Sequence, residues 1–407
     1  MANILVVHQN FPGQFPHITD ALLARGDKVA ALGGKTAAGR PGVDLRRWSN
    51  DRGSTKGVFE IATRAEADFI RGAAAAAAAG RLKQDGFTPD VIIAHPGWGE
   101  PLFLKEIWPD ARMIIFGELL YRSHGGDINF DPEFGAESLA ANVRVHAKNA
   151  TQVLAAAYAD RIVCPTRFQA DSYPPALQEL IRVIHEGVDM DHAQRREHAA
   201  VQIPDGRSLD RSTPVVTFVS RTLEPLRGFH IFMRALPEFL AACPSAEVLI
   251  IGSAALNGYG VASPNGRDWQ SYLLDELGDR LDRKRVHFLG KVPHATLIDA
   301  FSISWAHVYY TYPFVLSWSL VEAMAAECLV IGSDTAPVRE AITDGVEGIL
   351  RPFFDVPALS QAMREAVAEP NSFTAMRVAA RRRALEDYDR ARGTAAWLAL
   401  IDELLVA

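Results

Sequence analysis

A short segment in the second half of the chain, Ser220–Gly228, places two arginines directly after an apolar run. Guanidinium groups bind phosphate oxygens through charge-assisted hydrogen bonds and stabilise negative charge on a departing diphosphate. Arg221 and Arg227, with Ser220 beside them, therefore indicate a pyrophosphate clamp at the start of a loop. The alternative is a pair of surface arginines, one of which bridges Glu224.

A second segment, Tyr309–Ala325, changes from a strand pattern to a helical one. Ser317 suits the N-cap of a helix that carries Glu322. Neighbours of Glu322 at helical spacing are uncharged, so its carboxylate needs a specific partner, and a ribose diol would donate two hydroxyls. A glutamate favoured by the helix dipole is the equal alternative. Free amides at a helix start bind diphosphate, which makes the following residues candidates for a diphosphate site: Leu316, Ser317, Trp318 and Ser319.

Polar residues also follow three apolar runs in the N-terminal half. They are Gly13 and Gln14 in a Gly/Pro loop, His95 before a tight turn, and Glu118. In doubly wound sheets ligands lie beyond the carboxyl ends of the strands, so His95, which directly follows the run Val91–Ala94, should face a ligand. His95 suits contact with a ligand hydroxyl, and capping of the turn is its alternative role.

Short apolar runs and helical stretches alternate along the whole chain, which predicts parallel sheets covered by helices on both faces. The length of 407 residues favours two domains. We therefore expect an α/β protein with two Rossmann-like, doubly wound domains. Their expected bounds are residues 1–195 and 214–388, with a linker lacking periodicity at 196–213 and a closing helix at 389–407. The expected strands are Ile4–Val7, Val29–Leu32, Val91–Ala94, Met113–Phe116, Arg161–Cys164, Arg182–His185, Val215–Val219, Glu247–Ile251, Val286–Leu289, His307–Tyr310, Leu329–Ile331 and Gly348–Leu350.

Composition excludes several classes of protein. The net charge of −7 and pI near 6.0 argue against nucleic-acid binding. Three scattered cysteines suit neither a disulfide framework nor a zinc site, and with no leader or long apolar run they lead us to expect a cytoplasmic protein. The Ala-rich helix Arg64–Leu82 carries Arg64, Arg71, Arg81 and Lys83, which favour a solvated face, with weak peripheral membrane contact as the alternative.

Together, Arg221–Gly228 and Thr311–Ala325 resemble the two donor-site signatures of the family 4 retaining glycosyltransferases, which have the GT-B fold. Arg285–Val292, which contains Lys291, is similar to the family's strand whose following loop meets the nucleobase. Ile184–Asp189 resembles the sequence that closes the family's N-terminal domain. The resemblance covers nearly the whole chain and is strongest between residues 215 and 355.

The resemblance implies a reaction and a role for each of several residues. It implies transfer from a UDP- or GDP-sugar to an acceptor hydroxyl with retention and without metal or other cofactor, in domains that face each other across a cleft. It assigns Arg221 and Arg227 to the donor phosphates and Glu322 to the ribose. Gly13 and Gln14 match the family's loop near the diphosphate, and Glu118 stands where many members carry a histidine that touches the sugar. The closing helix would cross back onto the first domain.

One departure from the family pattern concerns sugar recognition. Phe314 occupies the place of the first glutamate of the family's E-x-x-x-x-x-x-x-E pattern and cannot hydrogen-bond a sugar hydroxyl. It keeps a non-catalytic nucleotide-sugar binder or assembly partner open as an alternative, beside an epimerase on the same fold. The carboxylate-rich segment Asp127–Glu133 is interpreted as a structured loop or acceptor contact, with no metal site expected. The acceptor, a saccharide, lipid-linked or natural-product hydroxyl, is not specified by the sequence.

Overall fold

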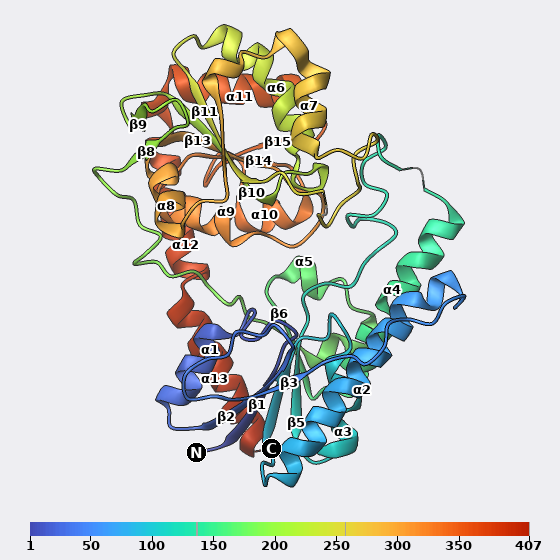
Figure 1. The fold of residues 1–407 in the computed structure, drawn as a ribbon. Coiled ribbons are helices and arrows are strands. Elements are labelled where there is room, and N and C mark those ends of the chain that lie inside the picture. The colour runs from blue at the N-terminus through green and yellow to red at the C-terminus, as the bar shows by residue number, and fades with distance from the viewer. Residues whose placement is uncertain (136, 257, 407) are drawn as a thin grey trace. The chain divides into compact units, whose positions relative to one another are not determined.

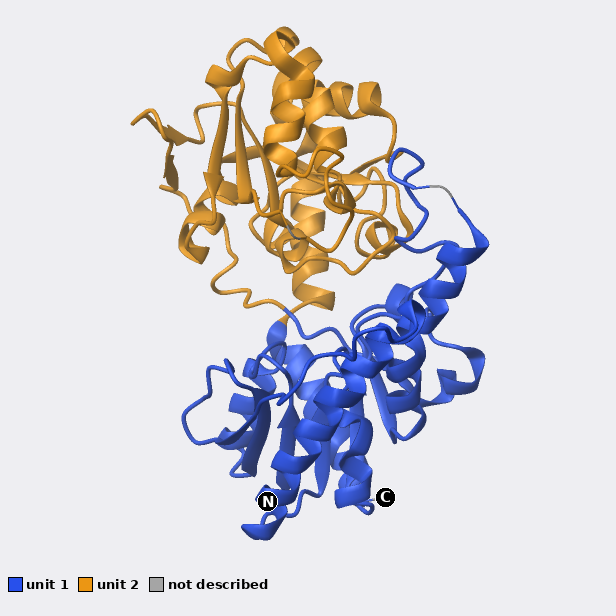
Figure 2. Cartoon of the chain, turned by 45° about the vertical axis from the view of Figure 1, so that its right-hand side comes forward, with its two compact units in different colours: residues 1–187, 390–407 blue, residues 188–389 orange. Residues whose placement is uncertain are grey.

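The computed structural model describes residues 1–135, 137–256 and 258–406 (Figure 1). Two compact units are distinguished in Figure 2: unit 1 is Met1–Gly187 together with Arg390–Ala407, and unit 2 is Val188–Asp389. Each unit has its own parallel sheet with helices on both faces, which is the Rossmann-like arrangement expected for each half of a GT-B fold.

The unit 1 sheet has the strand order β3-β2-β1-β4-β5-β6-β7, and all neighbouring strands are parallel. Successive strands are added in one direction from β1 to β3 and in the opposite direction from β4 to β7. The position between β1 and β4 is therefore the topological switch point of the sheet. β3 was not expected, because its five residues are mostly polar. The strands are β1 (Asn3–Val7), β2 (Lys28–Gly34), β3 (Asp44–Trp48), β4 (Val91–Ala94), β5 (Arg112–Phe116), β6 (Arg161–Cys164) and β7 (Ile181–Val183).

Helices cover both faces of this sheet (Figure 1). α1 (Pro16–Ala24) and α13 (Arg390–Val406) lie on one face, where Trp397 packs against Phe15 in a buried cluster. On the other face lie α2 (Thr63–Gln84), α3 (Leu104–Ile107) and α4 (Leu139–Ala157), while the short α5 (Arg167–Ala170) follows β6. The small side chains of α2 allow close packing, since its Ala75, Ala78 and Ala79 are fully buried.

Arg64 and Arg71 of α2 bind groups inside unit 1, which changes the interpretation of these two residues. Arg64 donates to the Gly97 carbonyl, and Arg71 donates to the Trp98 carbonyl at 2.8 Å. Both arginines also pair with the buried Asp68. These bonds tie the loop after β4 to α2, so Arg64 and Arg71 position that loop. Arg81 and Lys83 are exposed, as expected of a solvated face.

The unit 2 sheet has the order β12-β11-β10-β13-β14-β15 with all neighbours parallel, and its winding reverses between β10 and β13. Each of these strands overlaps an expected one. Their bounds are β10 (Val215–Thr222), β11 (Glu247–Ser253), β12 (Val286–Gly290), β13 (Ser304–Tyr309), β14 (Val330–Ser333) and β15 (Ile349–Arg351).

Unit 2 also buries its sheet between two helical layers (Figure 1). One layer holds α6 (Phe229–Ala242), α7 (Trp269–Leu277) and α11 (Val356–Ala368). The other holds α8 (His294–Ile303), α9 (Trp318–Ala325), α10 (Ala336–Ala341) and α12 (Thr374–Asp387), whose buried residues form one apolar cluster.

The boundary between the units differs from the expected one. Unit 1 ends at Gly187, before the expected residue 195, and residues 196–213 are not an irregular linker. They contain an antiparallel pair, β8 (Ala200–Gln202) and β9 (Ser208–Asp210), whose central Val201 and Leu209 are buried in a core cluster of unit 2. Strands with a single buried residue each are too short to show a period in the sequence.

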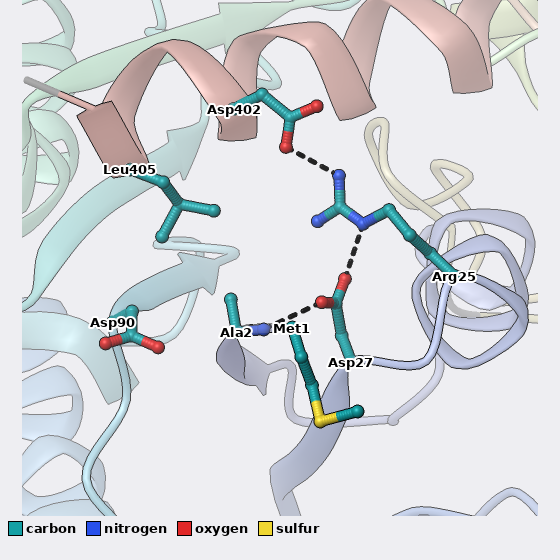
Figure 3. A pocket seen from close by; sticks show the side chains of 7 residues that line it. All are labelled: Met1, Ala2, Arg25, Asp27, Asp90, Asp402 and Leu405. Atoms are coloured by element: carbon teal, nitrogen blue, oxygen red, sulfur yellow. Dashed lines mark hydrogen bonds and ion pairs between the residues drawn. The ribbon is translucent and has the colours of Figure 1, made fainter.

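A polar pocket of about 420 Å³ lies at the amino-terminal edge of the unit 1 sheet (Figure 3). Arg25 pairs there with Asp27 and Asp402, and Asp27 accepts from the Ala2 amide. These bonds fasten α13 to the start of β2. Ligands of doubly wound sheets bind at the opposite, carboxyl-terminal edge, so we assign this pocket a structural role. Among the described residues, no helix is both long and apolar enough to cross a bilayer.

Candidate functional site

Candidate residues gather at the switch point of each sheet. In unit 1, His8 directly follows β1, His95 directly follows β4, and Glu118 comes shortly after the neighbouring β5. In unit 2, Arg221 lies at the end of β10, and the segment that leads to α9 begins after β13. Each sheet therefore presents its polar residues where a doubly wound fold binds its ligand.

In unit 1, His8 supports the loop that carries Gly13 and Gln14. The Asn10 amide donates to His8 Nδ1 at 2.9 Å, so the ring proton is on Nε2, which donates to Gln14 Oε1 at 2.6 Å. Burial, reinforced by the nearby His95, lowers the pKa of His8 to about 4. Gly13 has φ +55°, and a Cβ there would lie 2.4 Å from the His8 ring. Only glycine lets this loop close over a neutral His8.

His95 and Gln14 both face the carboxylate of Glu118. The Gly97 amide donates to His95 Nδ1 at 3.0 Å, which leaves the proton on Nε2, 3.4 Å from Glu118 Oε2. Gln14 Nε2 approaches Glu118 Oε1 at 3.5 Å. Burial opposes ionisation of Glu118, but the N–H groups of His95 and Gln14 outweigh it and hold its pKa below the ordinary value. Glu118 is therefore present as a carboxylate. Its side chain is 43% exposed to solvent.

The sequence analysis did not identify two residues that lie beside His95, namely His8 and Trp98. Trp98 stacks on His95 with ring centroids 4.9 Å apart, and its ring also lies 5.4 Å from that of His8. The signal for His8 was present, because it follows its strand as directly as His95 follows β4. Trp98 gave no such signal, since its stacking depends on the fold of the turn.

In unit 2, the phosphate candidates Arg221 and Arg227 are held by separate contacts. Arg221 donates to the Tyr259 hydroxyl at 2.8 Å. Arg227 donates to the Val315 carbonyl at 2.8 Å and to Thr311 Oγ1 at 3.1 Å. Both guanidinium groups are therefore oriented at the carboxyl-terminal edge of the sheet.

Glu224, which the sequence offered as an alternative partner of one arginine, is buried and binds backbone amides. Its carboxylate accepts from the Gly260 amide at 2.7 Å and from the Tyr259 amide at 3.2 Å. The neighbouring Gly228 has φ +70°, and a Cβ there would lie 2.3 Å from Tyr310 Cβ. Glu224 thus ties down the loop after β11, and Gly228 lets α6 begin close to β13.

The expected N-cap at Ser317 is confirmed, because its Oγ accepts from the Ser319 amide at 3.3 Å. The two hydroxyls also bond to each other at 2.8 Å, and the Ser317 amide donates to the Tyr309 hydroxyl. Glu322 is only 9% exposed, and its Oε1 lies 2.7 Å from Nε2 of His294, the first residue of α8. The carboxylate of Glu322 thus has a protein partner, His294, which the sequence analysis did not identify, and the ribose contact stays a prediction.

Comparisons with known proteins agree with this arrangement. The family model described as glycosyl transferase family 4 group matches residues 25–193, and the one described as glycosyl transferases group 1 matches residues 204–383. The chain belongs to the family 4 glycosyltransferases. Sucrose-phosphate synthase from Thermosynechococcus elongatus superposes over 100% of both chains with a TM-score of 0.74 at 17% identity, which shows that this family 4 glycosyltransferase has the GT-B fold.

The curated relatives are similar over part of their length. Phosphatidyl-myo-inositol mannosyltransferase of Mycolicibacterium smegmatis is 31% identical over 180 residues, which are 40% of this chain and 42% of the relative. D-inositol 3-phosphate glycosyltransferase of Nocardia farcinica is 29% identical over 48% of this chain and 42% of its own length. Among solved structures, Anabaena HepE in complex with UDP has a TM-score of 0.70 at 16% identity and covers 99% of this chain and 100% of its own.

The other expected donor residues of this glycosyltransferase lie as follows. The Ser220 hydroxyl donates to the Thr222 carbonyl at 2.7 Å and is thus used inside the irregular end of β10. Lys291 is exposed just after β12. Leu316 packs against the apolar core, and Trp318 is 43% exposed at the start of α9. In the Asp127–Glu133 segment, the Glu133 amide donates to Asp131, as expected of a structured loop.

Proposed function

We propose that the protein transfers a glycosyl group from a UDP- or GDP-sugar to an acceptor hydroxyl, with retention of anomeric configuration and without a metal ion. The observation that carries the proposal is the placement of Arg221 and Arg227 at the switch point of unit 2, on the same sheet edge as the start of α9. A nucleoside diphosphate is the ligand class for which this edge of a doubly wound sheet is suited.

The two arginines have the chemistry that a metal ion would otherwise supply. The diphosphate departs with additional negative charge, and two oriented guanidinium groups stabilise that charge through their N–H donors. Glu322 lies one helical turn into α9, where its carboxylate can accept from ribose hydroxyls. His294 holds one oxygen of that carboxylate and so fixes its orientation.

In unit 1, His8 and His95 present an N–H group at Nε2, because Nδ1 of each accepts from a backbone amide, whereas Glu118 is the anionic acceptor. We assign Glu118 to a sugar hydroxyl, which would donate to the carboxylate. For retention, the proton of the acceptor hydroxyl passes to an oxygen of the leaving phosphate on the face from which that phosphate departs. The acceptor is a polyol or saccharide in this proposal, in line with the inositol derivatives in the names of the relatives.

Calorimetric titration with UDP and GDP in excess chelator tests the donor site first. We expect at least one to bind, and binding that requires magnesium or manganese would refute the metal-free assignment. A panel of UDP-, GDP- and dTDP-sugars then reports nucleotide release, with Arg221→Ala as the inactive control. The anomer of the product, read by NMR, tests retention.

Phe314 favours a second candidate, a protein that binds a nucleotide sugar without transferring it, because the family's glutamate is absent there. Tight nucleotide binding with no release from any donor, even with candidate acceptors present, would establish this second function in place of the first.

A further inference from the structure

Phe314 is part of a continuous row of contacts in unit 2 that joins the two arginines. The Arg221 guanidinium lies 5.6 Å from the centre of the Tyr259 ring. The rings of Tyr259 and Phe314 are 5.9 Å apart, and the Arg227 guanidinium lies 5.4 Å from the Phe314 ring. We call these four residues the guanidinium–aromatic row.

Three members of the row are also held by other contacts or by burial, whereas Arg221 is exposed and its hydrogen bond is to Tyr259, within the row. Glu224 accepts from the Tyr259 amide, and a Cβ at Gly258 would lie 2.1 Å from the Glu224 carboxylate, so the loop closes tightly there. Arg227 is anchored on the Val315 carbonyl. Phe314 is only 6% exposed. A ring buried to this extent is a packing element and offers no open face on which a sugar could lie.

We propose that Phe314 and Tyr259 are positioning residues that hold Arg221 and Arg227 for the two phosphates of a nucleoside diphosphate. The proposal rests on the function proposed above and names how its donor site is organised. The aromatic ring at position 314 then supports the phosphate clamp and is not a sugar contact.

The physical reason is preorganisation. A free arginine side chain populates many rotamers. A ligand that restricts it to one rotamer binds more weakly by the free energy of the conformational entropy that is lost. Rings packed against both guanidinium groups restrict them before the ligand arrives, through cation–π attraction and the Tyr259 hydroxyl. A diphosphate offers an oxygen group to each arginine, whereas a monophosphate offers one group only. The row therefore favours diphosphate over monophosphate.

A glutamate at position 314 would weaken the binding of a diphosphate. Its carboxylate would replace the ring beside Arg227 and pair with that guanidinium, so it would compete with the donor phosphate. The sequence pattern alone suggests the reverse, namely that Phe314→Glu would restore a sugar contact. The two interpretations thus differ in the sign of the effect.

The test compares UDP with UMP by calorimetry, using GDP and GMP if the wild type prefers guanosine. The variants are Tyr259→Phe, Phe314→Leu and Phe314→Glu, with Phe314→Tyr as the variant that retains a ring. Tyr272→Phe, in α7, is the matched control for loss of a tyrosine hydroxyl elsewhere in unit 2. Thermal unfolding without ligand identifies any variant that loses the fold, and Tyr259→Phe, which removes a single hydroxyl, remains informative if Phe314→Leu does not fold.

We expect the ratio of UDP to UMP affinity to fall about 3-fold to 10-fold in Tyr259→Phe and about 10-fold in Phe314→Leu. Phe314→Tyr should retain most of the affinity, and Phe314→Glu should weaken UDP more than any other variant. An unchanged ratio in both Tyr259→Phe and Phe314→Leu, or tighter UDP-sugar binding by Phe314→Glu, would overturn the proposal while leaving the donor site intact. A wild type that binds neither UDP nor GDP would overturn the proposed function together with this inference.

Discussion

Replacing Glu118 by glutamine removes a negative charge from the unit 1 site and keeps the size of the side chain. The carboxylate is approached by His95 Nε2 at 3.4 Å and Gln14 Nε2 at 3.5 Å. A glutamine in its place accepts through one oxygen only, and its own amide group would face a second N–H donor. We therefore expect the variant to bind a sugar hydroxyl less well and to hold His95 and Gln14 less firmly.

The magnitude follows from the exposure of Glu118. A hydrogen bond to a charged group contributes about 1.5–3 kcal/mol, and the lower part of this range applies because 43% of the side chain is exposed to solvent. About 1.5–2 kcal/mol corresponds to a decrease of about 10-fold to 30-fold in kcat/KM. The thermal midpoint should change little, since the contacts of Glu118 in the ligand-free protein are long.

The assay is nucleotide release from the preferred donor, measured as kcat/KM between pH 5.5 and 8 for wild type and Glu118→Gln. The pKa of Glu118 lies below its ordinary value, so the group stays ionised throughout this range and kcat/KM of the variant should be lower than that of the wild type at every pH. Any stability that the depressed pKa provides is present above the ordinary pKa and is lost only as the pH falls below it. Equal kcat/KM values for the two proteins across this range would refute this account of Glu118.

Three further predictions concern the donor site and the His8 loop. Arg221→Ala should weaken both UDP and pyrophosphate by about 1.5–3 kcal/mol in calorimetry, whereas Glu322→Ala should weaken UDP alone; equal losses for both ligands in the glutamate variant would make Glu322 structural. The depressed pKa of His8, about 4, means that its contribution to stability is complete above the ordinary pKa of 6.5 and is lost as the pH falls toward 4. Between pH 7 and pH 5 protonation of His8 in the unfolded state should thus lower the unfolding free energy by about 2 kcal/mol. The unfolding free energy of His8→Gln, measured with urea, should lack this part of the pH dependence. Gly13→Ala places a Cβ 2.4 Å from the His8 ring at φ +55°, and we expect a loss of about 1–3 kcal/mol in urea unfolding; a variant as stable as wild type would show that this loop rearranges freely.

Local patterns in the sequence were sufficient for the framework of the site. Each expected strand overlaps an observed one, because continuous apolar runs such as Val91–Ala94 mark strands buried on both faces. The cap at Ser317 was also predictable, since it depends on the hydroxyl and amides of adjacent residues. The β8–β9 pair was not, because its burial depends on contacts with β11 and α8, and nothing in its own short segments shows this.

What the sequence determined by itself was therefore the order of strands and helices, and with it the strand ends and loops at which His95, Glu118 and Arg221 lie. What only the tertiary structure decided was the partner of each side chain. Glu322 meets His294 across two helices, and Phe314 meets Tyr259 across two loops. These pairs are distant in the chain, and they form because parallel strands bring their carboxyl ends to one edge of the sheet, where packing selects the rotamers. A pattern read along the chain shows which residues reach that edge, but the contacts among them depend on the three-dimensional packing of the loops.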